Sequence, residues 1–149
     1  MKIQFMQPVC LCVGLGIATG LSAWGTPSDG VVIGHTKILD HGPDAQRYTI
    51  LLIAEGYRVS ELPQFANDAQ DFVDAFLATN PFRTNCSTFN FYRVDVAPPN
   101  SGADDPAVCG DGSTGTGVMV NTYFDATFCT GGARRALDVN RTTVMNVAN

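Results

Sequence analysis

Histidine is scarce in this 149-residue sequence, which contains only His35 and His41. The two lie six positions apart and share no helical face, so ordinary surface positions are favoured over a metal site for them. No histidine follows them in the chain. A Ser-His-Asp arrangement that uses the downstream serines would therefore have to recruit one of these two. This scarcity argues against a complete nucleophile–base constellation within the sequence.

Positive charge is also in short supply. The 9 lysine and arginine residues face 14 aspartate and glutamate residues, and the net charge is −5. No basic cluster is larger than the pair Arg134-Arg135. An acidic surface without a basic patch repels phosphate groups, which argues against a nucleic-acid partner.

The sequence lacks an apolar run long enough for a confident membrane span, which needs about 20 residues. The run over residues 9–21 is shorter, follows the single charge of Lys2 and is followed by small residues. That order predicts a signal peptide over residues 1–25, cleaved near Ala23 or Gly25, with an uncleaved anchor as the alternative. We therefore expect a secreted, periplasmic or cell-surface protein with no stable membrane span after cleavage.

Removal of that segment leaves Cys86, Cys109 and Cys129 of the five cysteines. An oxidising compartment permits disulfides. We favour the pair Cys109–Cys129, because both flank a glycine-rich loop that needs a covalent link. Cys86 would then be free or paired with a cysteine beyond residue 149. Three unpaired thiols are the alternative, and the absence of Cys-x-x-Cys spacing argues against a zinc site built from them.

Three regular elements stand out after a polar lead-in over residues 26–47. The continuous apolar run at residues 48–54 predicts a strand buried on both faces. Residues 60–80 carry apolar side chains at helical spacing, with Ser60 as the expected N-cap and Asn80-Pro81 as the stop. Residues 89–96 predict a second strand, which ends at a proline pair.

The remaining elements are less regular. Residues 31–33 are compatible with a short edge strand, and residues 98–121 form a long loop rich in glycine, serine, threonine and aspartate. Such loops are usually functional or disordered. Residues 136–139 suggest a third strand, and residues 143–149 the beginning of a helix. Strand, helix, strand, loop and strand in this order predict an α/β fold with right-handed crossovers.

Two loop motifs invite a chemical interpretation. Residues 110–115 match the dinucleotide pattern G-x-G-x-x-G, but a proline-rich loop precedes them and no amphipathic helix follows, so we interpret them as a flexible loop. Asp104, Asp105 and Asp111 supply hard oxygen ligands that suit Ca²⁺, although the EF-hand spacing is absent. Turn-capping hydrogen bonds are the structural alternative for these aspartates.

Glu55 lies just past the carboxyl end of the first predicted strand. In open α/β sheets, ligands bind at that edge. A place in a substrate cleft is one interpretation, and a carboxylate that ties down the following turn is the other.

Three segments carry a resemblance to a known family: Ile53-Ala54-Glu55-Gly56-Tyr57, residues 101–106 (Ser-Gly-Ala-Asp-Asp-Pro) and residues 122–128 (Thr-Tyr-Phe-Asp-Ala-Thr-Phe). Their sequence and order resemble the IgA-peptidase family of zinc metallopeptidases. The resemblance covers residues 48–140, and it implies a secreted bacterial endopeptidase with a zincin-like α/β domain. It also implies a zinc ion held by a His-Glu-x-x-His helix and a further acidic ligand.

None of those zinc ligands can be mapped onto this sequence, because the catalytic helix of the family lies downstream of the matching segments. We therefore expect residues 48–149 to be the N-terminal part of a metallopeptidase catalytic domain, a mixed sheet with packed helices that is incomplete at its C-terminus. Zinc belongs to the full-length parent, and this chain is expected to bind none and to be inactive alone.

On the substrate side, the resemblance leaves four cleft candidates, Glu55, Tyr57, Asp104 and Asp105. The expected partner is a protein or peptide substrate. A secreted, non-catalytic module that binds a protein or peptide is the alternative function.

Overall fold

The computed structural model describes residues 28–149, and the predicted signal peptide lies outside the described residues. The elements, in chain order, are β1 (Val31–Leu39), η1 (Asp44–Gln46), β2 (Tyr48–Ile53), η2 (Val59–Glu61), α1 (Leu62–Ala78), η3 (Arg83–Thr88), β3 (Phe89–Ala97), η4 (Thr130–Gly132) and α2 (Arg141–Ala148). No helix formed by residues 28–149 is long and apolar enough to cross a membrane.

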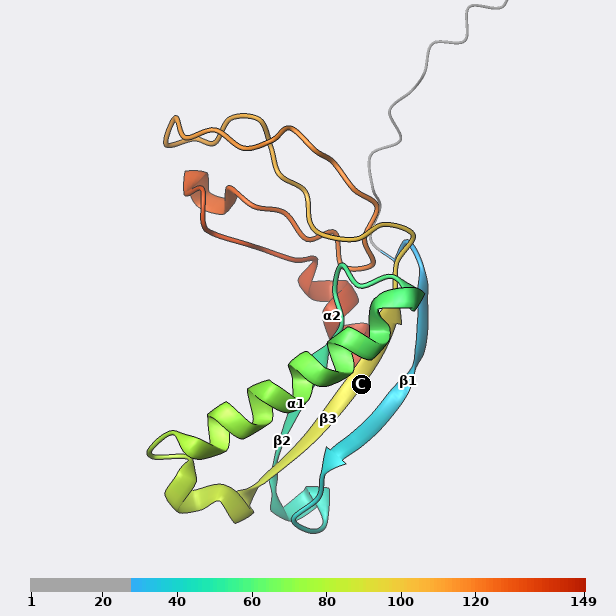
Figure 1. Ribbon diagram of the computed structural model, residues 1–149, viewed down its shortest axis with the longest axis vertical. Helices are drawn as coiled ribbons and strands as arrows, with labels where there is room; N and C mark the ends of the chain where they lie inside the picture. Colours follow the sequence, from blue (N-terminus) through green and yellow to red (C-terminus); the bar gives the residue numbers. More distant parts are fainter. Residues whose placement is uncertain (1–27) are drawn as a thin grey trace, which may run out of the picture.

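The three strands form one mixed sheet in the order β1-β3-β2, which confirms the α/β prediction. β2 runs parallel to β3, and α1 is the crossover that connects them. β1 runs antiparallel to β3. Figure 1 shows α1 in front of the sheet and α2 behind it. The carboxyl ends of β2 and β3 therefore meet at the same edge, and the chain from residue 98 onward leaves from there.

The core is centred on β3, where Phe91, Val94 and Val96 are fully buried. β2 was expected to be buried on both faces, and that prediction was wrong. As an edge strand it has a neighbour on one side only, and it is exposed at its first two residues and half-buried over the rest. Its continuous apolar run therefore marks a strand beside the buried centre of the sheet.

α1 confirms the predicted helix, and its buried side chains Phe65, Ala69 and Val73 follow the expected spacing. Ser60 does not cap it. Instead, Ser60 lies inside η2, whose N-cap is Arg58, and the main-chain amide of Arg58 donates to the carboxylate of Glu61 at the N3 position at 2.9 Å.

The two helices cover opposite faces of the sheet. Phe76 of α1 meets Phe91 edge-on, with ring centroids 5.4 Å apart. On the other face, the carbonyl of Val147 in α2 lies 3.1 Å from Nε2 of His35, whose strand partner is Val94. Because residues 91 and 94 are an odd number of positions apart, their side chains point to opposite faces. Both faces of β3 are therefore covered.

β1 is much longer than the three-residue strand predicted at its start, and its nine residues include His35. It pairs with β3 along its length, with register shifts at two places. Polar residues such as Thr36 and Lys37 hide this strand in the sequence. They are tolerated because β1 lies at an edge of the sheet.

Residues 98–140 form an irregular lobe beyond the carboxyl end of the sheet (Figure 1). The predicted strand at residues 136–139 is wrong, since this segment makes only one isolated bridge, between Thr127 and Asp138. The predicted disulfide Cys109–Cys129 is confirmed and links two parts of the lobe. Cys86 is free and exposed. After the lobe comes α2, capped by Asn140, whose side chain accepts from the amide of Thr143.

Candidate functional site

The candidate site lies where the chain leaves β2. Ala54 is fully buried, and its amide donates to the carbonyl of Val94 at 3.0 Å, so the strand register extends one residue beyond Ile53. A hollow of about 350 Å³ opens directly after it. We call this the sheet-end hollow, and it is lined by Glu55, Gly56, Tyr57, Gly102, Ala103, Ala126, Phe128 and Leu137.

This lining draws on all three segments that carry the family resemblance. The first two meet through their glycines, since the amide of Gly102 donates to the carbonyl of Gly56 at 3.0 Å. Gly56 has φ +71°, and a Cβ there would clash with the carbonyl oxygen of Gly102. Only glycine allows both this backbone conformation and this close approach. Two segments whose contacting glycines are 46 positions apart in sequence are thus packed backbone to backbone.

Glu55 ties the third segment to the end of the sheet. Its carboxylate accepts from the main-chain amide of Phe124 at 3.2 Å and from that of Ala126 at 3.2 Å. Burial raises the pKa of Glu55, and hydrogen bonds from Thr122 and from the amides of Phe124, Ala126 and Gly56 oppose that shift. The carboxylate is engaged by its own chain, as in the turn-tying interpretation, although the turn that it holds is residues 122–126.

Tyr57 forms one wall of the hollow, and two contacts with α1 fix its ring. Its hydroxyl donates to Oδ2 of Asp68 at 2.9 Å, and this hydrogen bond raises the pKa of Tyr57. The ring packs against Phe65, with centroids 5.1 Å apart. Tyr57 is therefore held as a rigid wall.

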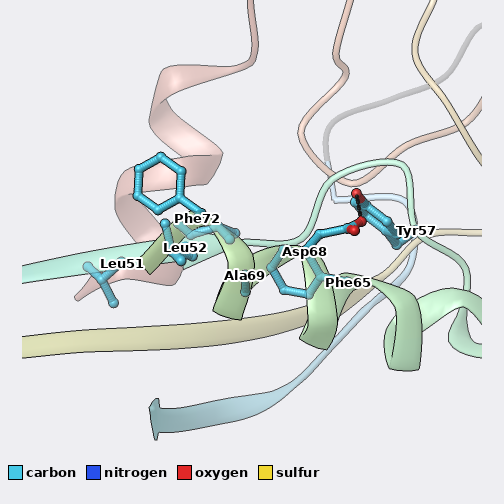
Figure 2. Close-up of a pocket in the computed structure, with 8 residues that line it drawn as sticks. Leu51, Leu52, Tyr57, Phe65, Asp68, Ala69 and Phe72 are labelled. Carbon is cyan, nitrogen blue, oxygen red and sulfur yellow. Dashed lines mark hydrogen bonds between the residues drawn. The ribbon is translucent and has the colours of Figure 1, made fainter. Parts of the chain in front are cut away.

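Tyr57 also borders a second concavity, which Figure 2 shows between β2 and α1. This groove has a volume of about 280 Å³. Leu51 and Leu52 contribute from β2, while Phe65 and Phe72 contribute from α1. Phe72 lies at the end of the groove away from Tyr57 and is 48 % exposed. The groove is apolar over most of its length.

The other two cleft candidates, Asp104 and Asp105, do not belong to the lining of the hollow. Asp104 is buried, and its Oδ1 accepts from the amide of Val120 at 2.7 Å. Asp105 accepts from the amide and hydroxyl of Thr116 at 2.9 and 2.8 Å, and these bonds lower its pKa. Its Oδ1 lies 2.8 Å from Nη2 of Arg134. Both carboxylates link segments of the lobe that lie 16 and 11 residues apart, so neither makes the local turn-capping bond of the structural alternative. Asp111 does make such a bond, since it accepts from the amide of Ser113 two residues later.

The structure thus places Glu55 and Tyr57 in the lining, while Asp104 and Asp105 lie in the supporting loop. Contact of any of the four with a substrate stays a prediction. Sequence reasoning missed Ala126, Phe128 and Leu137 as lining residues. The position of Phe128 next to Cys129 is the sequence signal that could have identified this wall, because the predicted disulfide holds that part of the lobe.

The described residues do not fit a metal site. Within residues 28–149, no three or more histidine, cysteine, aspartate or glutamate side chains gather closely enough to hold a metal ion. His35 contacts the carbonyl of Val147, and Nδ1 of His41 lies 3.0 Å from the carbonyl of Phe89. The His35 ring thus joins β1 to α2, and the His41 ring joins the segment after β1 to the start of β3.

The dinucleotide-like motif at residues 110–115 is part of a turn. Asp111 accepts from the amide of Ser113 at 2.9 Å, and the amide of Gly115 donates to the carbonyl of Ala107 at 3.1 Å. No α-helix begins after the motif until α2, and the short 3-10 helix η4 starts only at Thr130, so the helix N-terminus that binds a pyrophosphate is not adjacent. The interpretation as a loop is confirmed.

Comparison with known proteins gives one result that bears on this site. A family model described as IgA Peptidase M64 matches residues 36–149, more than three quarters of the chain. The match includes all three segments that line the sheet-end hollow. No curated protein matches the chain.

Proposed function

The chain belongs to the IgA peptidase M64 family, and on that premise we propose that it forms the N-terminal, substrate-side part of a secreted zinc metalloendopeptidase. In this proposal, residues 48–149 belong to the catalytic domain and the substrate is a protein or peptide. The proposal places the zinc ligands outside residues 28–149, and it is supported by the lack of any group of three or more potential ligand side chains within that range. Zinc, when bound by the complete enzyme, would activate the water that attacks the peptide bond.

One observation carries the proposal: three segments that resemble the family converge on a single hollow at the carboxyl end of a parallel strand pair. Ligands in open α/β sheets bind at that edge, because the loops that follow the strands surround it. Here Glu55 and Gly56 follow β2 directly, and Gly102 follows β3 by five residues. The geometry therefore favours substrate binding at this place.

The residues of this chain bind and orient in the proposed mechanism. Glu55 has its oxygens engaged by main-chain amides, so we assign it a positioning role, which holds the turn at residues 122–126 against the sheet. Tyr57 contributes a fixed apolar wall. Asp104 and Asp105 keep the lobe in place through Val120, Thr116 and Arg134.

Secretion is the second part of the proposal. It rests on the signal-like residues 1–25 and is supported by the disulfide Cys109–Cys129, since such links persist in oxidising compartments. Cys129 follows Phe128 directly, so the disulfide stabilises the part of the lobe that walls the hollow. In an exported enzyme, a disulfide of this kind would stabilise the loops that form the site.

A secreted, non-catalytic module that binds peptide is the second candidate, and the apolar groove between β2 and α1 is the observation that favours it. Reading the DNA after codon 149 in all three frames separates the two. We expect a His-Glu-x-x-His motif followed by an acidic residue, in frame or displaced by one base. A stop codon followed by unrelated sequence would reject the peptidase and leave the binding module.

A further inference from the structure

We propose that the sheet-end hollow is a specificity subsite that receives one large apolar side chain of the peptide substrate, with Leu137 as the wall that selects it. This inference rests on the proposed function, which it deepens by naming the class of side chain. The sequence did not single out Leu137 as a site residue. Leu137 lies far along the chain from the segment that follows β2, although both line the same hollow.

Half of the residues that line the hollow are small, which leaves room for a ligand side chain. Gly56, Gly102, Ala103 and Ala126 contribute no side chain longer than a methyl group. A Cβ placed on Gly102 would meet no atom within 4 Å, so the space beside this glycine is open. A volume of about 350 Å³ is at the lower end of the range for ligand pockets and suits one side chain better than a helix or a strand.

The walls are apolar and held in place before any ligand arrives. Tyr57 is fixed by Asp68, as described above. The amide of Phe128 donates to the carbonyl of Asp104 at 2.9 Å, and the guanidinium of Arg134 lies 5.3 Å from the centre of the Phe128 ring.

Leu137 is held by its neighbours in the chain. The amide of Asp138 donates to Thr127 at 2.9 Å, and Thr127 donates back at 3.0 Å. The Leu137 side chain itself is 53 % exposed, although it lines the hollow. An apolar side chain that enters the hollow would cover this surface and remove it from water, which is favourable.

Charge and hydrogen bonding select an apolar occupant over a polar one. The lining contains one carboxylate, Glu55, and no lysine, arginine or histidine, so an acidic side chain would be repelled. Three amides of the lining already have acceptors, since Ala126 donates to Glu55, Gly102 to Gly56 and Phe128 to Asp104. A polar side chain would lose its water and find these donors already engaged.

The test is a titration of the full chain, followed by NMR of its methyl and amide groups. The probes are N-acetyl-phenylalaninamide and N-acetyl-leucinamide, with N-acetyl-glycinamide and N-acetyl-aspartate amide as comparison compounds. We expect saturable shifts at Ala103, Ala126 and Leu137 with the two apolar amides and none with the comparison compounds. Equal shifts with all four compounds, or shifts confined to the groove between β2 and α1, would overturn the proposal.

Two variants and a matched control sharpen the test. Leu137→Ala removes the wall and should weaken binding of the phenylalanine compound about tenfold, the loss expected for one contact in an apolar pocket. Ala103→Leu fills the hollow and should abolish binding. Val118→Ala is the control, because Val118 is also 53 % exposed and lies in the same lobe but outside the lining. Unchanged binding in both Leu137→Ala and Ala103→Leu would overturn the proposal.

This titration needs neither zinc nor hydrolysis, so its outcome is independent of the test of the peptidase. Binding of the apolar amides by a chain whose gene lacks His-Glu-x-x-His would reject the peptidase and keep the subsite. A gene with that motif and a chain that binds no apolar amide would keep the peptidase and reject the subsite. Dispersion of the amide resonances shows that each variant is folded before its result is used.

Discussion

The carboxylate of Glu55, two residues past the end of β2, accepts a hydrogen bond from the main-chain amide of Ala126, 71 residues later in the chain. The same carboxylate accepts from Phe124. This contact brings the third family segment to the end of the sheet and so completes the hollow.

Glu55→Ala should destabilise the fold. The amide of Ala126 keeps the hydroxyl of Thr122 as an acceptor at 3.2 Å, whereas the amide of Phe124 loses the acceptor it had in Glu55. An unsatisfied buried donor costs about 1–3 kcal/mol, to be read from urea denaturation. The control is Asp74→Ala, since this exposed carboxylate accepts from Gln70 on the surface of α1. A loss no larger than that of the control would contradict the anchoring role.

The stability of the protein should depend on pH through Glu55. Burial raises the pKa of this carboxyl above its ordinary value of 4.5. A carboxyl with a higher pKa in the folded chain contributes stability below its unfolded pKa, and loses that contribution as pH rises through the folded value. As pH rises above about 4.5, wild type should therefore lose stability relative to Glu55→Gln, which does not titrate. Denaturation midpoints that run parallel over this range would count against the shift.

A reverse dependence is expected at Asp44 in acid. The hydroxyl of Tyr92 donates to Asp44 at 2.7 Å and is the main cause that lowers the pKa of Asp44 to about 2, with Lys37 and Asn90 as further causes. This contribution is present above the unfolded pKa near 3.8 and is lost as pH falls toward 2. Asp44→Asn should lose less stability than wild type over that range. An identical acid response in both proteins would refute the assignment.

Gly56→Ala should disrupt the junction between the first two family segments. Gly56 and Gly112 both have positive φ, at +71° and +80°, so alanine is strained at either position. Only at Gly56 would the new Cβ clash with backbone, that of Gly102, because nothing lies within 4 Å of a Cβ at Gly112. We expect Gly112→Ala to cost about 1–2 kcal/mol and Gly56→Ala clearly more, as measured by thermal unfolding. Equal losses would show that no close approach exists.

Removal of the disulfide should loosen the lobe. Cys109 and Cys129 are separated by 20 residues, and closing a loop of about that length contributes about 3 kcal/mol. Cys109→Ser should therefore lower the denaturation midpoint and expose residues 98–140 to proteases. Cys86→Ser is the matched control, because this thiol is free and exposed. A Cys86 variant that is as unstable as the Cys109 variant would argue for a different pairing.

The elements that the sequence predicted well are those whose local pattern agrees with their tertiary place. α1 has a buried face formed by Phe65, Ala69 and Val73 at helical spacing, and the pattern needs no knowledge of partners. The β2–α1–β3 order predicts a parallel pair by itself, because two parallel strands need a crossover. The glycine-rich loop between Cys109 and Cys129 likewise predicted the disulfide that joins them.

What the sequence could not predict depends on contacts between distant segments. Polar residues in β1 are acceptable only because it is an edge strand paired with β3. Leu137 resembled a strand residue, yet its segment is held by a single bridge at Thr127. Ser60 looked like a cap, but Glu61 makes the capping bond to Arg58. The sheet-end hollow itself combines residues from 55 to 137, and no local pattern encodes that proximity.

Hydrolysis by the complete gene product tests the central claim most directly. The protein would be incubated with an unfolded protein substrate, with and without the zinc chelator 1,10-phenanthroline, and peptide cleavage would be followed by mass spectrometry. The account predicts cleavage that the chelator abolishes and added zinc restores, with bonds beside large apolar residues preferred in wild type and that preference reduced in Leu137→Ala. Absence of cleavage, or cleavage that persists in the chelator, would contradict it.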